Sequence, residues 1–337
     1  MTPSIRVSAE ALLQVRGLSI AYATPRGTVT AVRNVDLDVR AGEFLGIVGE
    51  SGSGKTQLLL AMLGLNASQA RLSGSIRYRE QELLGREVAE LNRIRGTRVC
   101  MIFQDPMTAL NPYLTVGRQI TEVLQVHRRM DARAAERRAL EMLDAVQIPE
   151  AARRLRQFPH ELSGGMRQRV MIAMALVAEP EIILADEPTT ALDVTVQAQI
   201  LAVLRELRER TRAAIVLVTH DLGVIAEVAD RVAVMYAGDI VEQAPVDELF
   251  TCPRHPYTEA LQRAIPRLDG PLPARLPSIG GSPPDPSAPP VGCPFAPRCL
   301  YRMAVCTQLP PALLPVAPEH LKACHYEGAL GRLAPPA

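Results

Sequence analysis

The spacing of apolar residues divides the first 250 residues into two kinds of predicted strand. Residues 12–22 and 31–39 alternate apolar with polar positions, which is typical of half-buried antiparallel strands. Four later segments are almost continuously apolar, as parallel strands buried on both faces are: residues 44–48, 99–103, 182–185 and 215–218. Helical patterns separate these segments, so we expect an α/β core preceded by a small antiparallel β subdomain.

A long helical segment interrupts the predicted core. No strand pattern occurs between residues 115 and 174, and apolar residues such as Ala135, Leu143 and Val146 recur at helical spacing. We therefore expect a helical subdomain over about residues 106–170. Residues 231–243 return to the alternation of a strand.

The end of the chain differs in composition from the rest. Prolines are frequent between residues 266 and 297, which argues against a continued helix or sheet there. We therefore predict a main domain over residues 1–250 and a separate C-terminal region over residues 251–337. The sequence contains no internal duplication, so we expect a single main domain.

Charge and hydropathy exclude several classes of protein. The 37 basic and 36 acidic residues nearly cancel, so composition gives no sign of nucleic-acid binding. The longest apolar run, residues 170–178, is about half as long as a membrane span. The N-terminus lacks a basic segment followed by an apolar stretch, so we expect a soluble protein that is not secreted.

Lysine is rare in this chain. Almost every basic residue is an arginine, and lysine occurs only at Lys55 and Lys322. A lysine kept against this bias indicates a site that needs a compact ammonium group and not a planar guanidinium.

A candidate phosphate loop surrounds Lys55. Residues 49–56, GESGSGKT, match the pattern G-x-x-x-x-G-K-[ST] between the predicted strand 44–48 and a helical run over residues 57–65. Backbone N–H groups of such a loop face phosphate oxygens at a helix N-terminus, Lys55 can reach the β- and γ-phosphates of ATP, and the Thr56 hydroxyl can bind Mg²⁺. A Gly/Ser-rich turn that matches by chance is the alternative. The predicted contacts of the nucleotide are Gly49, Ser51, Gly52, Ser53, Gly54, Lys55 and Thr56.

Two carboxylates follow the buried strand 182–185. Asp186 and Glu187 stand at its C-terminal end, where open α/β sheets bind ligands. We expect Asp186 to hold Mg²⁺ directly or through water, and Glu187 to act as the general base for the attacking water. Two solvated acids that cap a strand end are the alternative interpretation of this pair.

Residues 162–169, LSGGMRQR, lie before Asp186 inside the helical segment. A Ser-Gly-Gly at a helix N-terminus exposes N–H groups that can bind an anion, although it can also be a simple helix cap. This segment resembles the signature of ABC transporter ATPases. The resemblance, which covers about the first 260 residues, implies that Ser163, Gly164 and Gly165 contact ATP held by a partner subunit. Met166 departs from the glutamine usual in the family, a variant common in its peptide-importer ATPases.

Four more residues match motifs of this family in the expected order. By resemblance, Gln104 senses Mg²⁺ and the attacking water, Asp193 of Ala191-Leu192-Asp193 communicates across the dimer, and His220 contacts the γ-phosphate. Tyr22 matches the aromatic residue that stacks on adenine. His220 at a strand end and Tyr22 can alternatively be ordinary core residues.

Three further segments are similar to the oligopeptide/dipeptide importer branch: residues 22–27 (YATPRG), 105–112 (DPMTALNP) and 254–258 (RHPYT). The second segment stands where ABC ATPases receive the coupling helices of membrane subunits. A proline- and asparagine-rich loop is its alternative interpretation.

The resemblance implies an ATPase subunit that powers uptake of di- or oligopeptides from the cytoplasmic face of the cell inner membrane. Its expected partners are a second homologous ATPase subunit in a heterodimer, two transmembrane permease subunits and, indirectly, an extracytoplasmic peptide-binding protein. An importer of nickel or another small solute is the alternative, followed by a non-transport ABC ATPase. Repair ATPases of this family carry a long coiled coil and translation ATPases two ATPase units, and the sequence has neither.

Four of the six cysteines, Cys293, Cys299, Cys306 and Cys324, lie in the proline-rich C-terminal region. In a reducing compartment disulfides are not expected, and four thiolates in a segment with little core of its own form a candidate metal site. Their number suits a [4Fe–4S] cluster or Zn²⁺. Some peptide-importer ATPases that this chain resembles carry an iron–sulfur cluster in this region, so the resemblance implies the cluster. His325 could replace one of the four ligands. Unligated thiols are the alternative.

Overall fold

The structure is a computed structural model that describes residues 11–25, 27–189, 193–265, 279–288 and 290–331. The described residues divide into two compact units, each built from several segments. The first unit consists of residues up to Gln14, Asp38–Glu43 and Arg77–Leu217. The second unit consists of Val15–Leu37, Phe44–Ile76 and the chain from Val218 onward.

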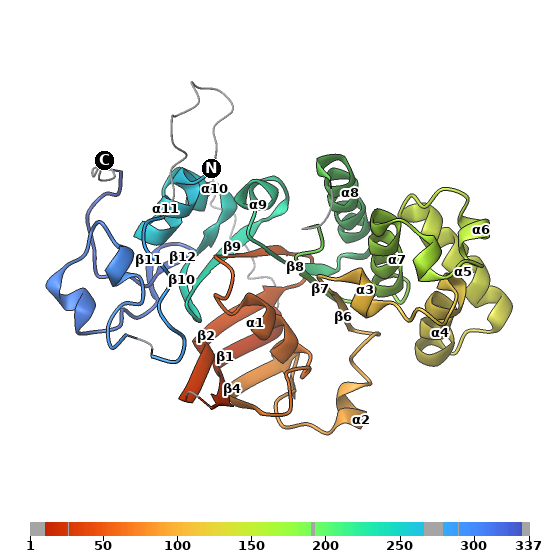
Figure 1. The fold of residues 1–337 in the computed structure, drawn as a ribbon, viewed down its shortest axis with the longest axis horizontal. Coiled ribbons are helices and arrows are strands. Elements are labelled where there is room, and N and C mark those ends of the chain that lie inside the picture. Colours follow the sequence, from red (N-terminus) through yellow and green to blue (C-terminus); the bar gives the residue numbers. More distant parts are fainter. Residues whose placement is uncertain (1–10, 26, 190–192, 266–278, 289, 332–337) are drawn as a thin grey trace, which may run out of the picture. The chain divides into compact units, whose positions relative to one another are not determined.

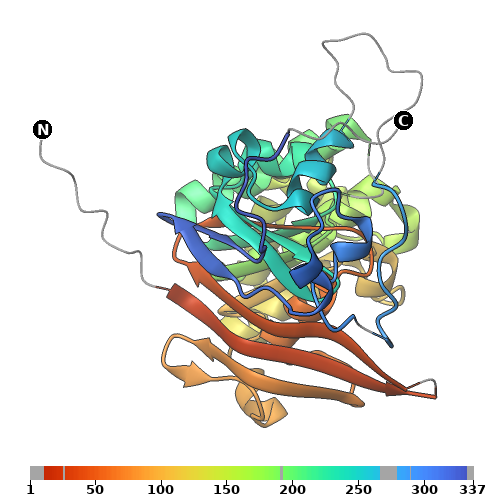
Figure 2. The ribbon, with the colours of Figure 1, turned by 90° about the vertical axis from the view of Figure 1, so that its left-hand side faces the viewer.

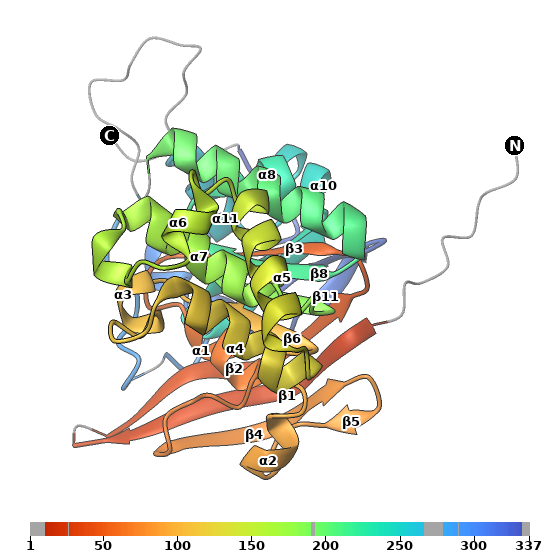
Figure 3. The ribbon, with the colours of Figure 1, turned by 90° about the vertical axis from the view of Figure 1, so that its right-hand side faces the viewer.

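The predicted N-terminal β-sheet is present. Strands β1 (Ala11–Thr24) and β2 (Gly27–Arg40) are long neighbours in the order β2-β1-β4, where β4 is Ala70–Tyr78 (Figures 2 and 3). In β2 the side chains of Val35, Leu37 and Val39 are buried while alternate residues are more exposed, as the sequence pattern indicates. The short β5 (Gln81–Glu82) pairs antiparallel with the end of β4.

The second unit also contains part of a mixed sheet. Strand β3 (Phe44–Val48) pairs parallel with β9 (Arg231–Tyr236), and β9 forms an antiparallel hairpin with β10 (Asp239–Pro245). All five residues of β3 are buried, as the apolar run predicts. Helix α1 (Lys55–Met62) follows β3, α9 (Leu222–Val228) precedes β9, and α10 (Val246–Thr251) follows β10.

The C-terminal region adds to this sheet. Strand β12 (His320–Lys322) pairs antiparallel with β10, with Glu242 opposite Lys322, and β11 (Leu314–Ala317) pairs with β12. Helix α11 (Pro256–Arg263) and the 3₁₀ turns η2 (Ala296–Arg298) and η3 (Ala304–Thr307) complete its described part. The division at residue 250 remains a prediction. Strand β12 lies after this residue and pairs with β10, which lies before it, so the two predicted regions share a sheet.

The first unit holds the helical segment (Figure 1). Strand β6 (Val99–Ile102) pairs parallel with β7 (Ile182–Asp186), and β8 (Ala214–Thr219) is the other neighbour of β7. The helices of the unit are α2 (Val88–Leu91), α3 (Pro106–Ala109), α4 (Val116–Arg128), α5 (Ala132–Ala145), α6 (Ala151–Arg154), η1 (Pro159–Glu161), α7 (Gly164–Leu176) and α8 (Val194–Thr211). Helices α4, α5 and α7 pack together, so the predicted helical character of residues 115–174 is confirmed.

None of the helices in the described ranges is long and apolar enough to cross a membrane.

Candidate functional site

The phosphate loop, residues 49–56, connects β3 to α1. Gly54 occupies the N-cap of α1 with φ 101°, a left-handed conformation that favours glycine. A Cβ atom on Gly54 would lie 2.2 Å from the carbonyl oxygen of Ala31, and one on Gly49 would lie 2.1 Å from that of Met235. Neighbouring backbone therefore leaves room only for glycine at both ends of the turn.

The Lys55 ammonium is enclosed by this loop. The side chain is 5% exposed, and Nζ donates hydrogen bonds to the carbonyl oxygens of Gly49 at 2.8 Å and Glu50 at 2.9 Å. Burial of a charge requires such compensation. The site accepts a compact cation, which accounts for a lysine here in a chain whose basic residues are almost all arginine. Thr56, the next residue, is exposed at the start of α1.

Tyr22 and His220 also belong to the second unit. The Tyr22 hydroxyl donates to Oε1 of Gln57 in the first turn of α1, so the half-buried ring is fixed beside the helix that begins at Lys55. His220 directly follows β8 and is exposed. The interpretation of His220 as a buried core histidine is therefore wrong.

Gln104, Asp186 and Glu187 lie together in the first unit, because β6 and β7 are adjacent parallel strands. Asp186 ends β7 and is 3% exposed. The Gln104 amide nitrogen is 3.4 Å from a Glu187 carboxylate oxygen, a long contact. Glu187 has φ 44°, a left-handed conformation that is uncommon outside glycine and clusters at functional sites.

The signature segment, residues 162–169, begins helix α7. Ser163 is its N-cap and accepts a hydrogen bond from the Met166 N–H at 3.3 Å. A Cβ atom on the exposed Gly164 would meet nothing within 4 Å. Packing within the described part of the chain therefore does not require glycine at this position, which leaves the first turn of α7 open to a ligand or partner.

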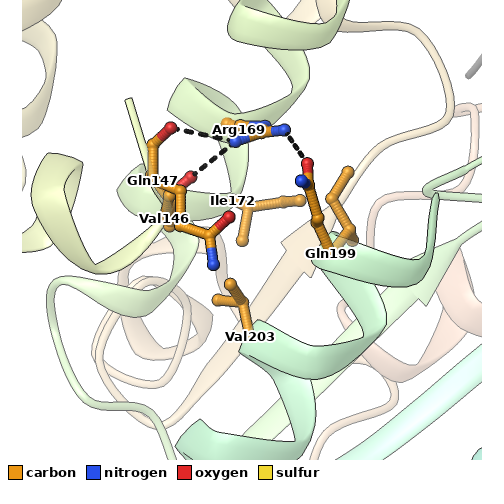
Figure 4. Close-up of a pocket in the computed structure, with 7 residues that line it drawn as sticks. Val146, Gln147, Arg169, Ile172, Gln199 and Val203 are labelled. Atoms are coloured by element: carbon orange, nitrogen blue, oxygen red, sulfur yellow. Dashed lines mark hydrogen bonds between the residues drawn. The ribbon is translucent and has the colours of Figure 1, made fainter. Parts of the chain in front are cut away.

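Two residues of the signature segment that the sequence did not single out have structural roles. The buried Gln168 side chain donates to the carbonyl oxygen of Pro188 at 2.6 Å, which joins α7 to the loop after Glu187. Arg169 donates to the Gln147 carbonyl oxygen at 2.9 Å and to the Gln199 side chain (Figure 4). The Arg169 side chain thus links α7 to α8 and to the segment that follows α5. The only sequence signal for Gln168 and Arg169 was that both lie inside the signature motif.

Asp193 caps helix α8 and accepts a hydrogen bond from the Val196 N–H at 2.9 Å. Ala191 and Leu192 of the same motif lie outside the described residues. The described candidate site residues belong to two groups. The first unit contains Gln104, Ser163, Gly164, Gly165, Asp186, Glu187 and Asp193, and the second contains Tyr22, the phosphate loop, His220 and the four C-terminal cysteines.

Those four cysteines line one small cavity together with aromatic residues that include Phe295 and Tyr301. Burial raises the pKa of Cys293 to about 11 and that of Cys299 to about 12. No group of three or more His, Cys, Asp or Glu side chains within the described ranges is arranged to hold a metal ion. All four thiols are free of disulfides, and His325 Nε2 lies 3.0 Å from the Leu309 carbonyl oxygen.

Known proteins resemble this chain over most of its length. The ABC transporter family model matches residues 32–190, and the model of the oligopeptide/dipeptide transporter C-terminal region matches residues 241–306. The oligopeptide transport ATP-binding protein OppD of Salmonella typhimurium is 50% identical over 316 residues, which are 94% of each chain. The dipeptide transport ATP-binding protein DppD of Bacillus subtilis is 49% identical over 319 residues, again 94% of each chain.

A solved structure extends the comparison to the fold. The ATP-binding cassette MJ0796, in a dimeric post-hydrolysis state bound to ADP and Pi, is 31% identical with a TM-score of 0.64. The match covers 69% of this chain and 98% of that one. The expected α/β architecture of an ABC cassette, a RecA-like phosphate-loop ATPase core, is thereby confirmed. The chain belongs to the oligopeptide/dipeptide transporter family of ABC ATP-binding proteins.

Proposed function

We propose that this chain hydrolyses ATP to power an importer of di- or oligopeptides, bound peripherally at the cytoplasmic face of the inner membrane. The proposal of nucleotide binding rests on the Lys55 ammonium, which the phosphate loop encloses. Peptide as the substrate rests on the OppD and DppD relatives and on the match to the peptide-transporter C-terminal region. That match favours peptide over nickel, another small solute or a non-transport role.

The roles of the site residues follow from their chemistry. The phosphate loop and Lys55 bind the ATP phosphates, and Tyr22 stacks on adenine. Asp186, Thr56 and Gln104 offer the oxygen donors that Mg²⁺ prefers, and the ion would neutralise charge on the β- and γ-phosphates. Glu187 accepts a proton from the attacking water, while His220 contacts the γ-phosphate.

A second homologous ATPase subunit completes the site. Ser163, Gly164 and Gly165 present the N–H groups of α7 to ATP on that subunit, and the open space around Gly164 agrees with such a contact. The similar cassette MJ0796 is dimeric in two solved structures, which supports a second ATPase subunit. We propose a heterodimer, as the importer branch implies, in which Asp193 lies at the subunit boundary.

The segment after Gln104 is the proposed docking site for the two permease subunits. Met107 on α3 is 60% exposed, and Tyr113 is 87% exposed. Arg167 of the signature segment donates to the Met107 sulfur and, at 2.7 Å, to the Pro159 carbonyl oxygen. The contact between Arg167 and Met107 links α3 to the first turn of α7, so a movement of α3 would reach the helix proposed to contact the partner's ATP.

Arg167→Ala is expected to reduce transport by about tenfold while ATP binding stays near wild type, because its contact with Met107 on α3 is removed together with the hydrogen bond to Pro159 that holds the side chain in place. Transport and nucleotide affinity are measured on the same reconstituted complex. Arg118→Ala is the control, since the Arg118–Glu122 pair on α4 lies on an exposed surface. Equal transport in the two variants would contradict the coupling role.

Co-purification tests the partners. The tagged chain, extracted from membranes in mild detergent, is expected to bring down a second ATPase and two permeases that mass spectrometry identifies. A peptide-binding protein encoded beside them supports peptide uptake. A nickel-binding protein in that place would support the alternative substrate, and isolation without membrane subunits would oppose a transport role.

We also propose that Cys293, Cys299, Cys306 and Cys324 hold a [4Fe–4S] cluster, which would stabilise a region rich in proline. The four cysteines line one cavity and offer an all-thiol ligand set, but no three of them are arranged to hold a metal ion in this structure, so cluster binding would require the side chains to move together. Protein purified without oxygen is expected to be brown and to contain about four iron atoms per chain. Replacement of Cys306 by serine is expected to lower the iron content. Colourless protein with stoichiometric zinc would contradict the cluster.

A further inference from the structure

We propose that Arg298 of the C-terminal region is a positioning residue that holds the phosphate loop through Glu50 and thereby sets the affinity for ATP. The inference rests on the proposed function and adds a role for the C-terminal region. Glu50 is the second residue of the phosphate loop, and Arg298 lies 248 positions later in the sequence.

Arg298 and Glu50 form a two-point ion pair. Nη1 of Arg298 lies 2.6 Å from one carboxylate oxygen of Glu50, and Nη2 lies 2.9 Å from the other. The Arg298 side chain is 3% exposed. A paired, buried guanidinium fixes the orientation of its carboxylate, which a solvated surface pair does not do.

The remaining N–H groups of Arg298 are also bound. Nε donates to the Gly280 carbonyl oxygen at 2.9 Å, Nη1 to the Tyr236 hydroxyl at 3.2 Å and Nη2 to the Ile279 carbonyl oxygen at 3.3 Å. With the two bonds to Glu50, these contacts occupy the five donors of a guanidinium. The site is therefore built for arginine, and a lysine could reproduce only part of it.

The backbone of Glu50 is also held by the C-terminal region. Its N–H donates to the hydroxyl oxygen of Tyr257 at 2.9 Å, and the Tyr257 side chain is fully buried. The rings of Tyr257 and Phe295 lie 5.3 Å apart, and Phe295 begins the turn that carries Arg298. Main chain and side chain of Glu50 are thus both fixed by residues of the C-terminal region.

Glu50 also contacts the Lys55 ammonium. The carbonyl oxygen of Glu50 accepts a hydrogen bond from Nζ of Lys55 at 2.9 Å. Residues 50–53 of the phosphate loop also line a cavity of about 390 Å³ together with residues 283–286. A shift of Glu50 would therefore change both the position of the ammonium and the shape of the loop.

A double-mutant cycle with Arg298→Ala and Glu50→Gln tests this role. Each single change is expected to weaken ATP binding by about tenfold, with the KM for ATP raised similarly and kcat at saturating ATP changed less than about twofold, because a charge-assisted pair that only orients the loop is lost. The double variant is expected to bind ATP no more weakly than either single variant. Arg298→Lys is expected to recover only part of the affinity.

Arg263→Ala is the matched control, since Arg263 forms a 2.7 Å pair with Glu259 in the same C-terminal region. Melting temperatures separate loss of folding from loss of affinity, and Arg298→Lys with Glu50→Gln replaces Arg298→Ala in the cycle if the alanine variant does not fold. Affinity for ATP equal to that of Arg263→Ala, or additive losses in the double variant, would overturn the inference. If the wild-type chain itself fails to bind ATP, the proposed function fails instead.

Discussion

Glu187→Gln is expected to abolish ATP turnover in the assembled complex while ATP binding is retained. The amide has nearly the same shape as the carboxylate but cannot accept a proton from the attacking water. A positioned general base contributes about 10²–10⁴-fold to the rate, so a loss of that size is expected in kcat. Phosphate release and binding of a labelled nucleotide are measured on the same preparation.

Glu122→Gln is the control for this change, because Glu122 is exposed on α4 and its only described ion pair is a 3.9 Å contact with Arg118. Its turnover is expected to equal that of the wild type. Full ATPase activity in Glu187→Gln would remove Glu187 from the role of base. Loss of nucleotide binding in that variant would instead point to a structural role for the strained backbone at this position.

Lys55→Ala is expected to weaken ATP binding by about 100-fold or more, since two charge-assisted contacts to phosphate at roughly 1.5 kcal/mol each are lost. Lys55→Arg is expected to be similarly impaired. The ammonium lies 2.8 Å and 2.9 Å from two carbonyl oxygens, and a planar guanidinium is too large for that space. Binding is measured with a fluorescent ATP analogue.

Lys322→Arg is the matched control, because Lys322 is the other lysine of the chain and is also buried, with Nζ 2.6 Å from the Tyr326 carbonyl oxygen. Its ATP affinity is expected to remain near wild type. If Lys55→Arg binds ATP as tightly as Lys322→Arg does, the argument from the rarity of lysine is wrong.

The sequence pattern predicted the elements whose structure local burial determines. The buried strands β3, β7 and β8 have continuous apolar runs, and Ser163 stands at the start of α7, as the Ser-Gly-Gly pattern indicates. The adjacency of Gln104 and Glu187 depends on the pairing of the two parallel strands that they follow, which the sequence did not predict. The roles that the motifs assign to the residues of the candidate ATP site stay predictions.

Long-range contacts were not predictable from local patterns. Strand β4 was missed because much of Ala70–Tyr78 is exposed and polar, so its apolar positions form no clear alternation. The pairing of β12 with β10 and the contact between Arg298 and Glu50 join segments about 80 and 248 positions apart. Such contacts depend on the path of the chain, which periodicity does not report.

The most direct test of the account is ATP-driven peptide uptake into proteoliposomes that contain the complex isolated with this chain. A labelled short peptide is expected to accumulate only when ATP is supplied on the side of the membrane that carries this subunit and the peptide-binding protein is present. Glu187→Gln is expected to abolish this uptake. Uptake of Ni²⁺ but not of peptide, or undiminished peptide uptake by the Glu187→Gln complex, would contradict the account.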